Sequence, residues 1–102
     1  MREKDIERKV CDYAKAHDCL AYKFTSPQRA SVPDRLFVTD KGLVFFIEFK
    51  APGKKPTEGQ ASEIRRLRNK GVSVFVVDNV DVGKQIVGLM ALGVDVGEYT
   101  HT

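Results

Sequence analysis

Hydrophobic residues recur at helical spacing near the start of the chain. Over residues 3–16 they stand at Ile6, Val10, Tyr13 and Ala14, which predicts a helix with one buried face. Residues 20–24 (LAYKF) have the alternating, aromatic-containing pattern of a short strand. Residues 25–33 contain two prolines and are expected to form a loop.

Two β-rich runs follow, residues 35–39 and 43–50, separated by Asp40-Lys41-Gly42. A three-residue connection that contains glycine predicts a β-hairpin. With the turn centred on Lys41, the predicted cross-strand pairs are Val38 with Val44, Leu36 with Phe46, and Asp34 with Glu48. Because alternate residues of a strand share a face, both acids then lie with Lys50 on one face, at the open end of the hairpin.

Residues 57–60 (TEGQ) have the form of a helix-capping box. Thr57 would be the N-cap and Gln60 the third helical residue, whose side chain reaches back to the cap. The helix is expected to run to about residue 70 and to end at Gly71. Its predicted buried residues are Ala61, Ile64 and Leu67.

The last third of the chain predicts one strand and one helix. Residues 72–77 (VSVFVV) are apolar on both faces, which is typical of a central or parallel strand. Asn79 or Asp81 is expected to cap a helix that reaches about residue 92. The stripe expected to pack on the sheet is Val82, Ile86, Leu89 and Met90, which leaves Val87 for another surface.

The predicted order is α-β-β-β-α-β-α, an α/β fold with a mixed four-stranded sheet flanked by helices. Because a helix joins residues 43–50 to residues 72–77, these two strands are expected to be parallel neighbours through a right-handed crossover. The 102 residues are the size of one domain, so we expect a single domain over residues 1–102.

Composition excludes several classes of protein. Hydrophobic residues make up 42% and charged residues 30%, as in globular proteins. The longest apolar run, residues 43–47, is too short to cross a bilayer, and the N-terminus lacks the apolar segment of a signal peptide. Cys11 and Cys19 lack CxxC spacing and are expected to be reduced thiols. We therefore expect a cytoplasmic protein.

Charge is unevenly distributed along the chain. Residues 1–70 hold 16 of the 17 Lys and Arg residues and 10 of the 14 acidic residues. Residues 71–102 hold one basic residue, Lys84, and four acidic residues. This asymmetry favours a polyanion-binding surface in the first part and another role for the last part.

The hairpin places its candidate chemistry at the open end, where Asp34 faces Glu48. Two directly opposed carboxylates repel each other, so they need a shared proton or a cation. Oxygen ligands of this kind suit Mg²⁺, which binds one or two carboxylates and completes its shell with water and phosphate oxygens. The alternative is that Lys50 is the cation and the three side chains form an ion pair only.

The chain resembles a known family of nucleases at these residues. Pro33-Asp34, followed by Glu48-Phe49-Lys50, has the form of the PD-(D/E)xK signature of restriction-endonuclease-like nucleases. Val32 to Arg35, Ile47 to Gly53 and the downstream Gln60 resemble the VRR-NUC (virus-type replication-repair nuclease) family more closely. The resemblance covers about residues 3–78. One departure is Ser31, where the family often has glycine.

The resemblance implies a metal site and a catalytic set. Asp34, Glu48 and the main-chain carbonyl of Phe49 would bind Mg²⁺, with Mn²⁺ as a substitute, and Lys50 would orient or deprotonate the attacking water. The family also carries a first-helix acid at the metal, for which Glu7 is expected because it borders the apolar stripe. Glu3, one turn earlier, is the alternative.

Gln60 has two possible roles. It is the third residue of the predicted capping box, and it also shares a helical face with Ile64 and Leu67, which points it towards the sheet. The resemblance implies that this glutamine sits beside the active site.

Basic residues surround this centre in the sequence. Lys54 and Lys55 lie in the loop that leaves the second hairpin strand, where they are expected to contact DNA phosphates. The further candidate DNA contacts are Lys23, Arg29, Arg35, Arg65 and Arg66, with Arg68 in the same basic cluster. The arginines of residues 65–68 are equally consistent with a solvated helix face. No aromatic stacking motif or recognition-helix pattern suggests base reading, so structure-selective binding is expected.

The sequence therefore predicts a Mg²⁺-dependent endonuclease that hydrolyses phosphodiester bonds in DNA. The resemblance to stand-alone phage-type members implies a homodimer that cuts branched DNA, such as four-way junctions, within a bacterial host cytoplasm. The dimer is expected to form through residues after Gly71, which are apolar and poor in basic side chains. The alternatives are a flap nuclease acting as monomer or subunit, a non-catalytic DNA-binding module of the same fold, and a nuclease for structured RNA.

Overall fold

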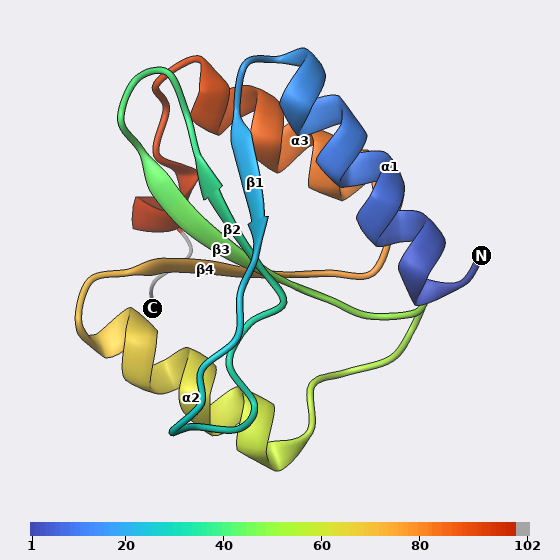
Figure 1. The fold of residues 1–102 in the computed structure, drawn as a ribbon, viewed down its shortest axis with the longest axis vertical. Helices are drawn as coiled ribbons and strands as arrows, with labels where there is room; N and C mark the ends of the chain where they lie inside the picture. The colour runs from blue at the N-terminus through green and yellow to red at the C-terminus, as the bar shows by residue number, and fades with distance from the viewer. Residues whose placement is uncertain (100–102) are drawn as a thin grey trace.

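The computed structural model describes residues 1–99 and has the element order predicted from the sequence (Figure 1). A short 3-10 helix, which the sequence did not predict, follows the last α-helix. The elements are α1 (Glu3–Ala16), β1 (Leu20–Lys23), β2 (Arg35–Val38), β3 (Val44–Phe49), α2 (Glu58–Asn69), β4 (Ser73–Val77), α3 (Val80–Ala91) and η1 (Val96–Tyr99). Residues 100–102, the end of the segment expected at a dimer interface, lie outside the described part.

The four strands form one mixed sheet in the order β1-β2-β3-β4. The β2–β3 hairpin has the predicted register, with Val38 paired to Val44 and Leu36 to Phe46. Gly42 adopts φ +78° in the turn, a conformation that glycine adopts without steric cost. Strands β3 and β4 are parallel, so the prediction of a crossover through α2 is confirmed.

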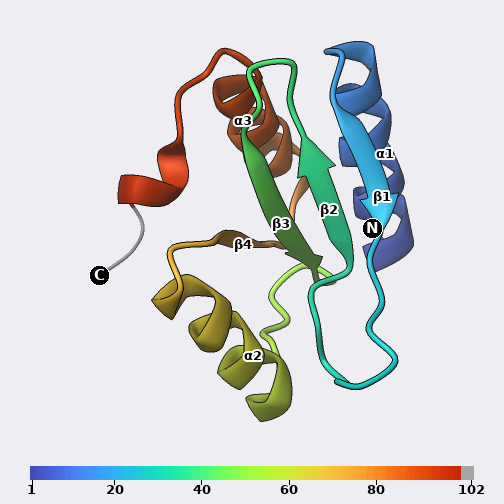
Figure 2. The same cartoon turned by 60° about the vertical axis from the view of Figure 1, so that its left-hand side comes forward.

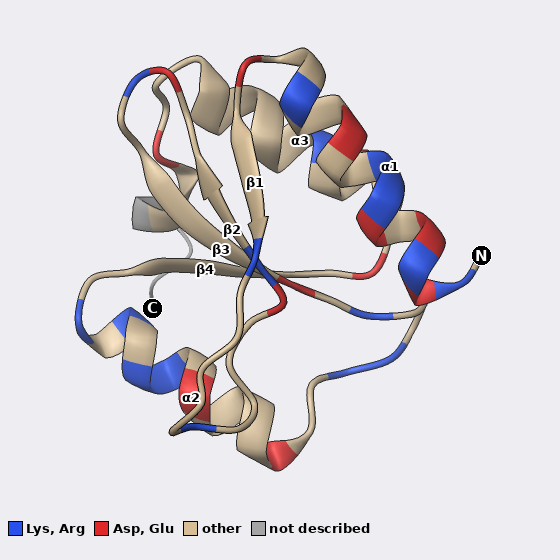
Figure 3. Ribbon diagram, viewed as in Figure 1, with Lys and Arg blue, Asp and Glu red and all other residues tan. Residues whose placement is uncertain are grey.

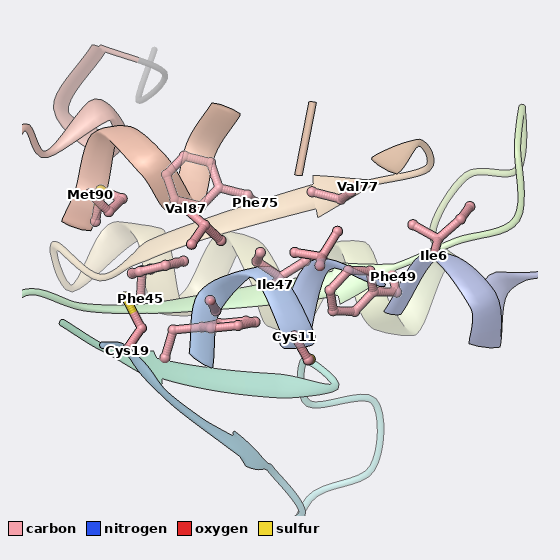
Figure 4. Packing of buried hydrophobic residues seen from close by; sticks show 13 residues of the cluster. Ile6, Cys11, Cys19, Phe45, Ile47, Phe49, Phe75, Val77, Val87 and Met90 are labelled. Atoms are coloured by element: carbon pink, nitrogen blue, oxygen red, sulfur yellow. The ribbon is translucent and has the colours of Figure 1, made fainter. Parts of the chain in front are cut away.

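Helices α1 and α3 pack side by side on one face of the sheet (Figures 1 and 2). The core lies between them and the strands (Figure 4). Its buried aromatic residues include Phe37 and Phe45, whose rings stack with centroids 5.0 Å apart. Cys11 and Cys19 are free thiols in this core, and burial raises the pKa of each.

The buried face of α3 differs from the prediction. Gly83, Val87 and Met90 are buried, whereas Val82 and Leu89 are each 41% exposed. The cause is a close approach of α3 to α1, since a Cβ atom at Gly83 would lie 2.5 Å from Val10 Cγ2. The helix turns its glycine towards α1, and the expected stripe of Val82, Ile86, Leu89 and Met90 is therefore wrong except at Met90 and the half-buried Ile86.

Helix α2 lies on the other side of the sheet (Figure 2). It packs mainly against β4, and Gln60 in its first turn also reaches Glu48 of β3. Ile64 is buried there as predicted, but Ala61 and Leu67 are only half-buried because α2 covers one edge of the sheet. No helix within residues 1–99 has the length and hydropathy needed to span a bilayer.

Candidate active site

The two acids predicted to face each other lie at the ends of neighbouring strands. Asp34 immediately precedes β2, and Glu48 is the fifth residue of β3. The ladder between β2 and β3 ends with the pair of Arg35 and Ile47, so Asp34 stands opposite Glu48 in the same register. The main-chain N–H of Phe49 donates a 2.8 Å hydrogen bond to Asp34 Oδ2, which fixes this carboxylate beside the peptide that follows Glu48.

Glu48 is a buried carboxylate with two different oxygen atoms. Its side chain is 2% exposed. Oε2 accepts a 2.9 Å hydrogen bond from Gln60 Nε2 and lies 3.6 Å from Lys50 Nζ. Oε1, by contrast, is the one buried side-chain polar atom within residues 1–99 that has no hydrogen-bond partner. Such an atom loses its hydration without compensation, which disfavours folding.

Burial raises the pKa values of both acids in spite of the nearby Lys50. The pKa of Glu48 is raised from 4.5 to about 7, by burial first and by the Asp34 carboxylate second, against the opposing effect of Lys50. Burial also raises the pKa of Asp34, although the Phe49 N–H and the charge of Lys50 act in the other direction. A simple ion pair with Lys50 therefore leaves Glu48 Oε1 without a partner.

These donors fit a hard divalent cation. Two neighbouring carboxylates, one of them with a bare buried oxygen, are the type of ligand that Mg²⁺ prefers, and Mg²⁺ usually takes only one or two protein carboxylates. The described residues contain no group of three or more His, Cys, Asp or Glu side chains placed to hold a metal. Water, a main-chain carbonyl and substrate oxygens would therefore have to complete the shell.

Comparisons with known proteins agree with this geometry. No family model matches the chain. It is 43% identical over 82 residues to "Putative nuclease p44" of Acyrthosiphon pisum secondary endosymbiont phage 1, an alignment that covers 80% of this chain and 88% of the relative. A solved structure described as a VRR_NUC domain superposes with a TM-score of 0.78 at 26% identity, covering 84% of this chain and 94% of the other.

The chain belongs to the VRR-NUC family. It has the nuclease fold of that family, so the predicted fold class is confirmed and its activity is that of a nuclease. The VRR-NUC fold explains why the acids meet. A hairpin and a parallel crossover strand bring the ends of β2 and β3 to the N-terminal turn of α2, where Gln60 contacts Glu48.

The two candidate acids of α1, Glu7 and Glu3, lie near the Asp34–Glu48 pair but are not part of it. Glu7 Oε2 accepts a 2.6 Å hydrogen bond from Arg35 Nε, so this carboxylate is held by a guanidinium. The charge of Glu7 nevertheless raises the pKa of Asp34, and that of Glu3 raises the pKa of Glu48. Glu7 and Glu3 therefore both act on the site electrostatically, which leaves either one available as the first-helix acid.

The candidate DNA contacts fall into two groups. Lys23, Lys54, Lys55 and Arg65 are exposed and form no ion pair within residues 1–99. The guanidinium groups of the other candidates already form ion pairs. Arg35 pairs with Glu7. Glu63 pairs with Arg29 at 3.0 Å and with Arg66 at 3.4 Å. Figure 3 shows the basic segments of α2 and of the loop before it.

The role of Glu63 was not predicted from the sequence. This residue is 7% exposed and ties the loop between β1 and β2 to α2 through Arg29. Its spacing of three residues from Arg66 was a visible helical ion-pair signal, but nothing local connected it to Arg29, which is 34 residues away. Arg68 is likewise structural, since its Nε and Nη2 atoms donate to the Val74 carbonyl at 3.0 Å and 2.6 Å.

Proposed function

We propose that this chain is a metal-dependent, structure-selective DNA endonuclease that acts on branched DNA as a homodimer. The observation that carries the proposal is the unpartnered Oε1 of Glu48, buried opposite Asp34 and beside Lys50. Leaving a buried carboxylate oxygen bare destabilises a protein unless a ligand restores the missing interaction. A purely DNA-binding module would gain nothing from acids held next to phosphate.

Asp34, Glu48 and the main-chain carbonyl of Phe49 are the proposed ligands of Mg²⁺ or Mn²⁺, with Glu7 as the first-helix acid and Glu3 as the alternative. When bound, the ion stabilises the charge that develops on the phosphate and lowers the pKa of a coordinated water. Gln60 keeps Oε2 of Glu48 engaged, so Oε1 is the oxygen left to face a ligand. Gln60 is therefore a positioning residue.

Lys50 is the proposed residue that acts on the nucleophile. Its side chain is 13% exposed and lies two residues after Glu48, just beyond the end of β3. From there it can orient or deprotonate a water and place positive charge beside the phosphate. Attack of this water on phosphorus breaks the bond to the 3′-oxygen, which leaves a 3′-hydroxyl and a 5′-phosphate.

The proposed DNA contacts address the phosphate backbone. Lys54 and Lys55 are exposed in the loop that follows β3. Contacts of this kind set position and affinity but carry no base sequence, which favours recognition of DNA shape. The other proposed contacts are Lys23, Arg29, Arg35, Arg65 and Arg66.

The proposed dimer uses the surface after Gly71. Leu92 is 75% exposed, Leu89 is 41% and Val94 is 42%. Leu89 and Leu92 line a groove between α1 and α3 together with Tyr13 and His17. Symmetric cutting of a four-way junction requires two active sites, and the single domain proposed for residues 1–102 supplies one.

The decisive experiment is cleavage of a labelled panel that contains a four-way junction, flap, fork, duplex, single strand and structured RNA. We expect branched DNA to be cut with Mg²⁺ or Mn²⁺ and not with EDTA. Asp34→Asn and Glu48→Gln should abolish cleavage, whereas Asp40→Asn, an acid at the other end of the hairpin, should not. Cleavage by Glu48→Gln at the wild-type rate would refute the assignment of the site.

A further inference from the structure

Strands β1 to β3 expose one face that no helix covers (Figure 2). Its side chains alternate with those that pack on α1 and α3. We call this surface the open sheet face; its members are Leu20, Tyr22, Phe24, Leu36, Val38, Val44 and Phe46. Leu20, Tyr22 and Val44 are 52%, 53% and 50% exposed. The other four members are half-buried. Exposed apolar side chains gathered on one face of a small domain favour a binding function.

The open sheet face continues directly into the active site. The N–H of Phe24 donates a 2.9 Å hydrogen bond to the carbonyl of Asp34, so Phe24 stands beside Asp34 in the row of side chains that contains both acids. The next row holds Tyr22, Leu36 and Phe46, which are aligned by the register of β1, β2 and β3. Successive rows are about 7 Å apart along the strands, which is within the reach of one nucleotide.

Aromatic rings are concentrated in these two rows. Phe24 and Phe46 lie edge to face with centroids 5.0 Å apart, and the Tyr22 ring is the most exposed of the three aromatic side chains. Nucleobases stack on such rings regardless of their sequence. In a duplex the base faces are hidden by neighbouring bases, so only an unpaired nucleotide can offer a free face.

Charge at the border of the face fits the same occupant. Lys23 is exposed next to Phe24, and its charge acts on Asp34 together with that of Lys50. In a polynucleotide each flat base is linked through its sugar to a phosphate. One nucleotide can therefore stack on the rings and contact the lysines at the same time. A protein partner packed on the apolar rows would have to cover these acids and lysines as well.

We propose that Tyr22, Phe24 and Phe46 form a stacking platform for an unpaired nucleobase adjoining the scissile phosphate. The inference rests on the proposed placement of that phosphate at Asp34 and Glu48. The stacking platform is then the feature that selects branched or gapped nucleic acid over a continuous duplex. The reaction itself is unchanged, because the rings hold the base and do not touch the phosphorus.

The test uses a junction with two unpaired nucleotides at the branch and 2-aminopurine placed either next to the cut or five nucleotides away. Binding is measured in EDTA, so no cleavage occurs. We expect wild-type protein and Tyr22→Phe to quench the fluorophore next to the cut only. Tyr22→Leu should lose the quenching, and Leu20→Ala, on the same strand face and equally exposed, should retain it.

Cleavage with Mg²⁺ supplies the second readout. The wild type should prefer the unpaired junction over a continuous duplex in kcat/KM, and Tyr22→Leu should reduce this preference about tenfold, the effect of one lost stack. Phe24→Leu provides a second variant should Tyr22→Leu fail to fold, with folding checked by circular dichroism.

Unchanged quenching and preference in both leucine variants would overturn the platform. A halved light-scattering mass in Tyr22→Leu would also overturn it, because the face would then be an interface between copies. A failure of the proposed catalytic site would be seen separately. Glu48→Gln would then still cleave the DNA, while the quenching of 2-aminopurine would be unchanged.

Discussion

Gln60 and Glu48 are joined by a 2.9 Å hydrogen bond from the amide nitrogen Nε2 to the carboxylate oxygen Oε2. The same glutamine accepts the Thr57 N–H at Oε1, and its own N–H donates to Thr57 Oγ1, which completes the predicted capping box. The two roles considered for Gln60 are therefore compatible in one rotamer. The start of α2 and the orientation of the buried acid depend on each other.

Gln60→Glu is expected to separate these two roles. The new side chain keeps an oxygen that can accept the Thr57 N–H but places a second carboxylate against Glu48 in place of a donor. Repulsion should raise the pKa of Glu48 further and lower cleavage activity well below that of wild type. Single-turnover cleavage of a branched substrate measures the effect.

Thr57→Ala is the matched control for that variant. It removes the side-chain cap and should cost about 1 kcal/mol in the free energy of unfolding, while the Gln60–Glu48 contact remains. If Thr57→Ala lost as much activity as Gln60→Glu at a temperature where both are folded, capping alone would explain the glutamine.

The metal-free protein should become less stable as pH rises from about 4.5 to about 7. The folded-state pKa of Glu48 is raised from 4.5 to about 7, so the folded state binds this proton more tightly than the unfolded state. The resulting stabilisation is complete below pH 4.5 and is lost as pH rises through 7. The shift corresponds to an effect on the order of 3 kcal/mol, measurable by urea unfolding in EDTA.

Glu48→Gln should remove most of this pH dependence, because glutamine does not titrate. Asp34, whose pKa is also raised, should leave a smaller trend of the same sign. Adding Mn²⁺ at pH 8 should raise the melting temperature of wild type and not that of Glu48→Gln. Equal pH profiles for the two proteins in EDTA would show that Glu48 ionises normally.

The hairpin and the strand crossover were readable from the sequence, but contacts that depend on how helices pack against distant segments were not. The hairpin register followed from the position of Gly42 in a short turn, which is a local constraint. The buried side of α3 depends on the approach of Gly83 to Val10 on another helix, and no pattern within α3 reveals it. The pairing of Arg35 with Glu7, 28 residues apart, also lies beyond sequence periodicity.

Lys54→Ala/Lys55→Ala should weaken DNA binding and reduce its salt dependence. Each phosphate contact contributes about one unit to the slope of log affinity against log salt concentration. The double variant should therefore lower the slope by about two units. Lys84→Ala is the control, since Lys84 lies over the Tyr13 ring between α1 and α3. An unchanged slope in the double variant would place the binding surface elsewhere.

Ser31 occupies a backbone conformation that suits glycine. Its φ angle is +68°, where an L-residue with a Cβ atom pays roughly 1–2 kcal/mol. The presence of Ser31 where the family often has glycine therefore affects the conformation of the loop. Ser31→Gly should be about 1 kcal/mol more stable to urea than Ser31→Ala, with cleavage activity close to wild type. If Ser31→Ala proved the more stable of the two, the loop would have another backbone conformation in solution.

Leu92→Asp should convert the proposed dimer into a monomer. Leu92 is 75% exposed in the single chain, so an aspartate there costs a monomer little, whereas burial in a two-fold interface would desolvate its charge. Light scattering at micromolar concentration should give twice 11.4 kDa for wild type and 11.4 kDa for the variant. Val44→Asp, on the open sheet face, should leave the dimer intact. If Val44→Asp alone dissociated the dimer, the interface would be the open sheet face. A monomeric wild type would instead favour the flap nuclease, because a single active site cannot cut both strands of a junction together.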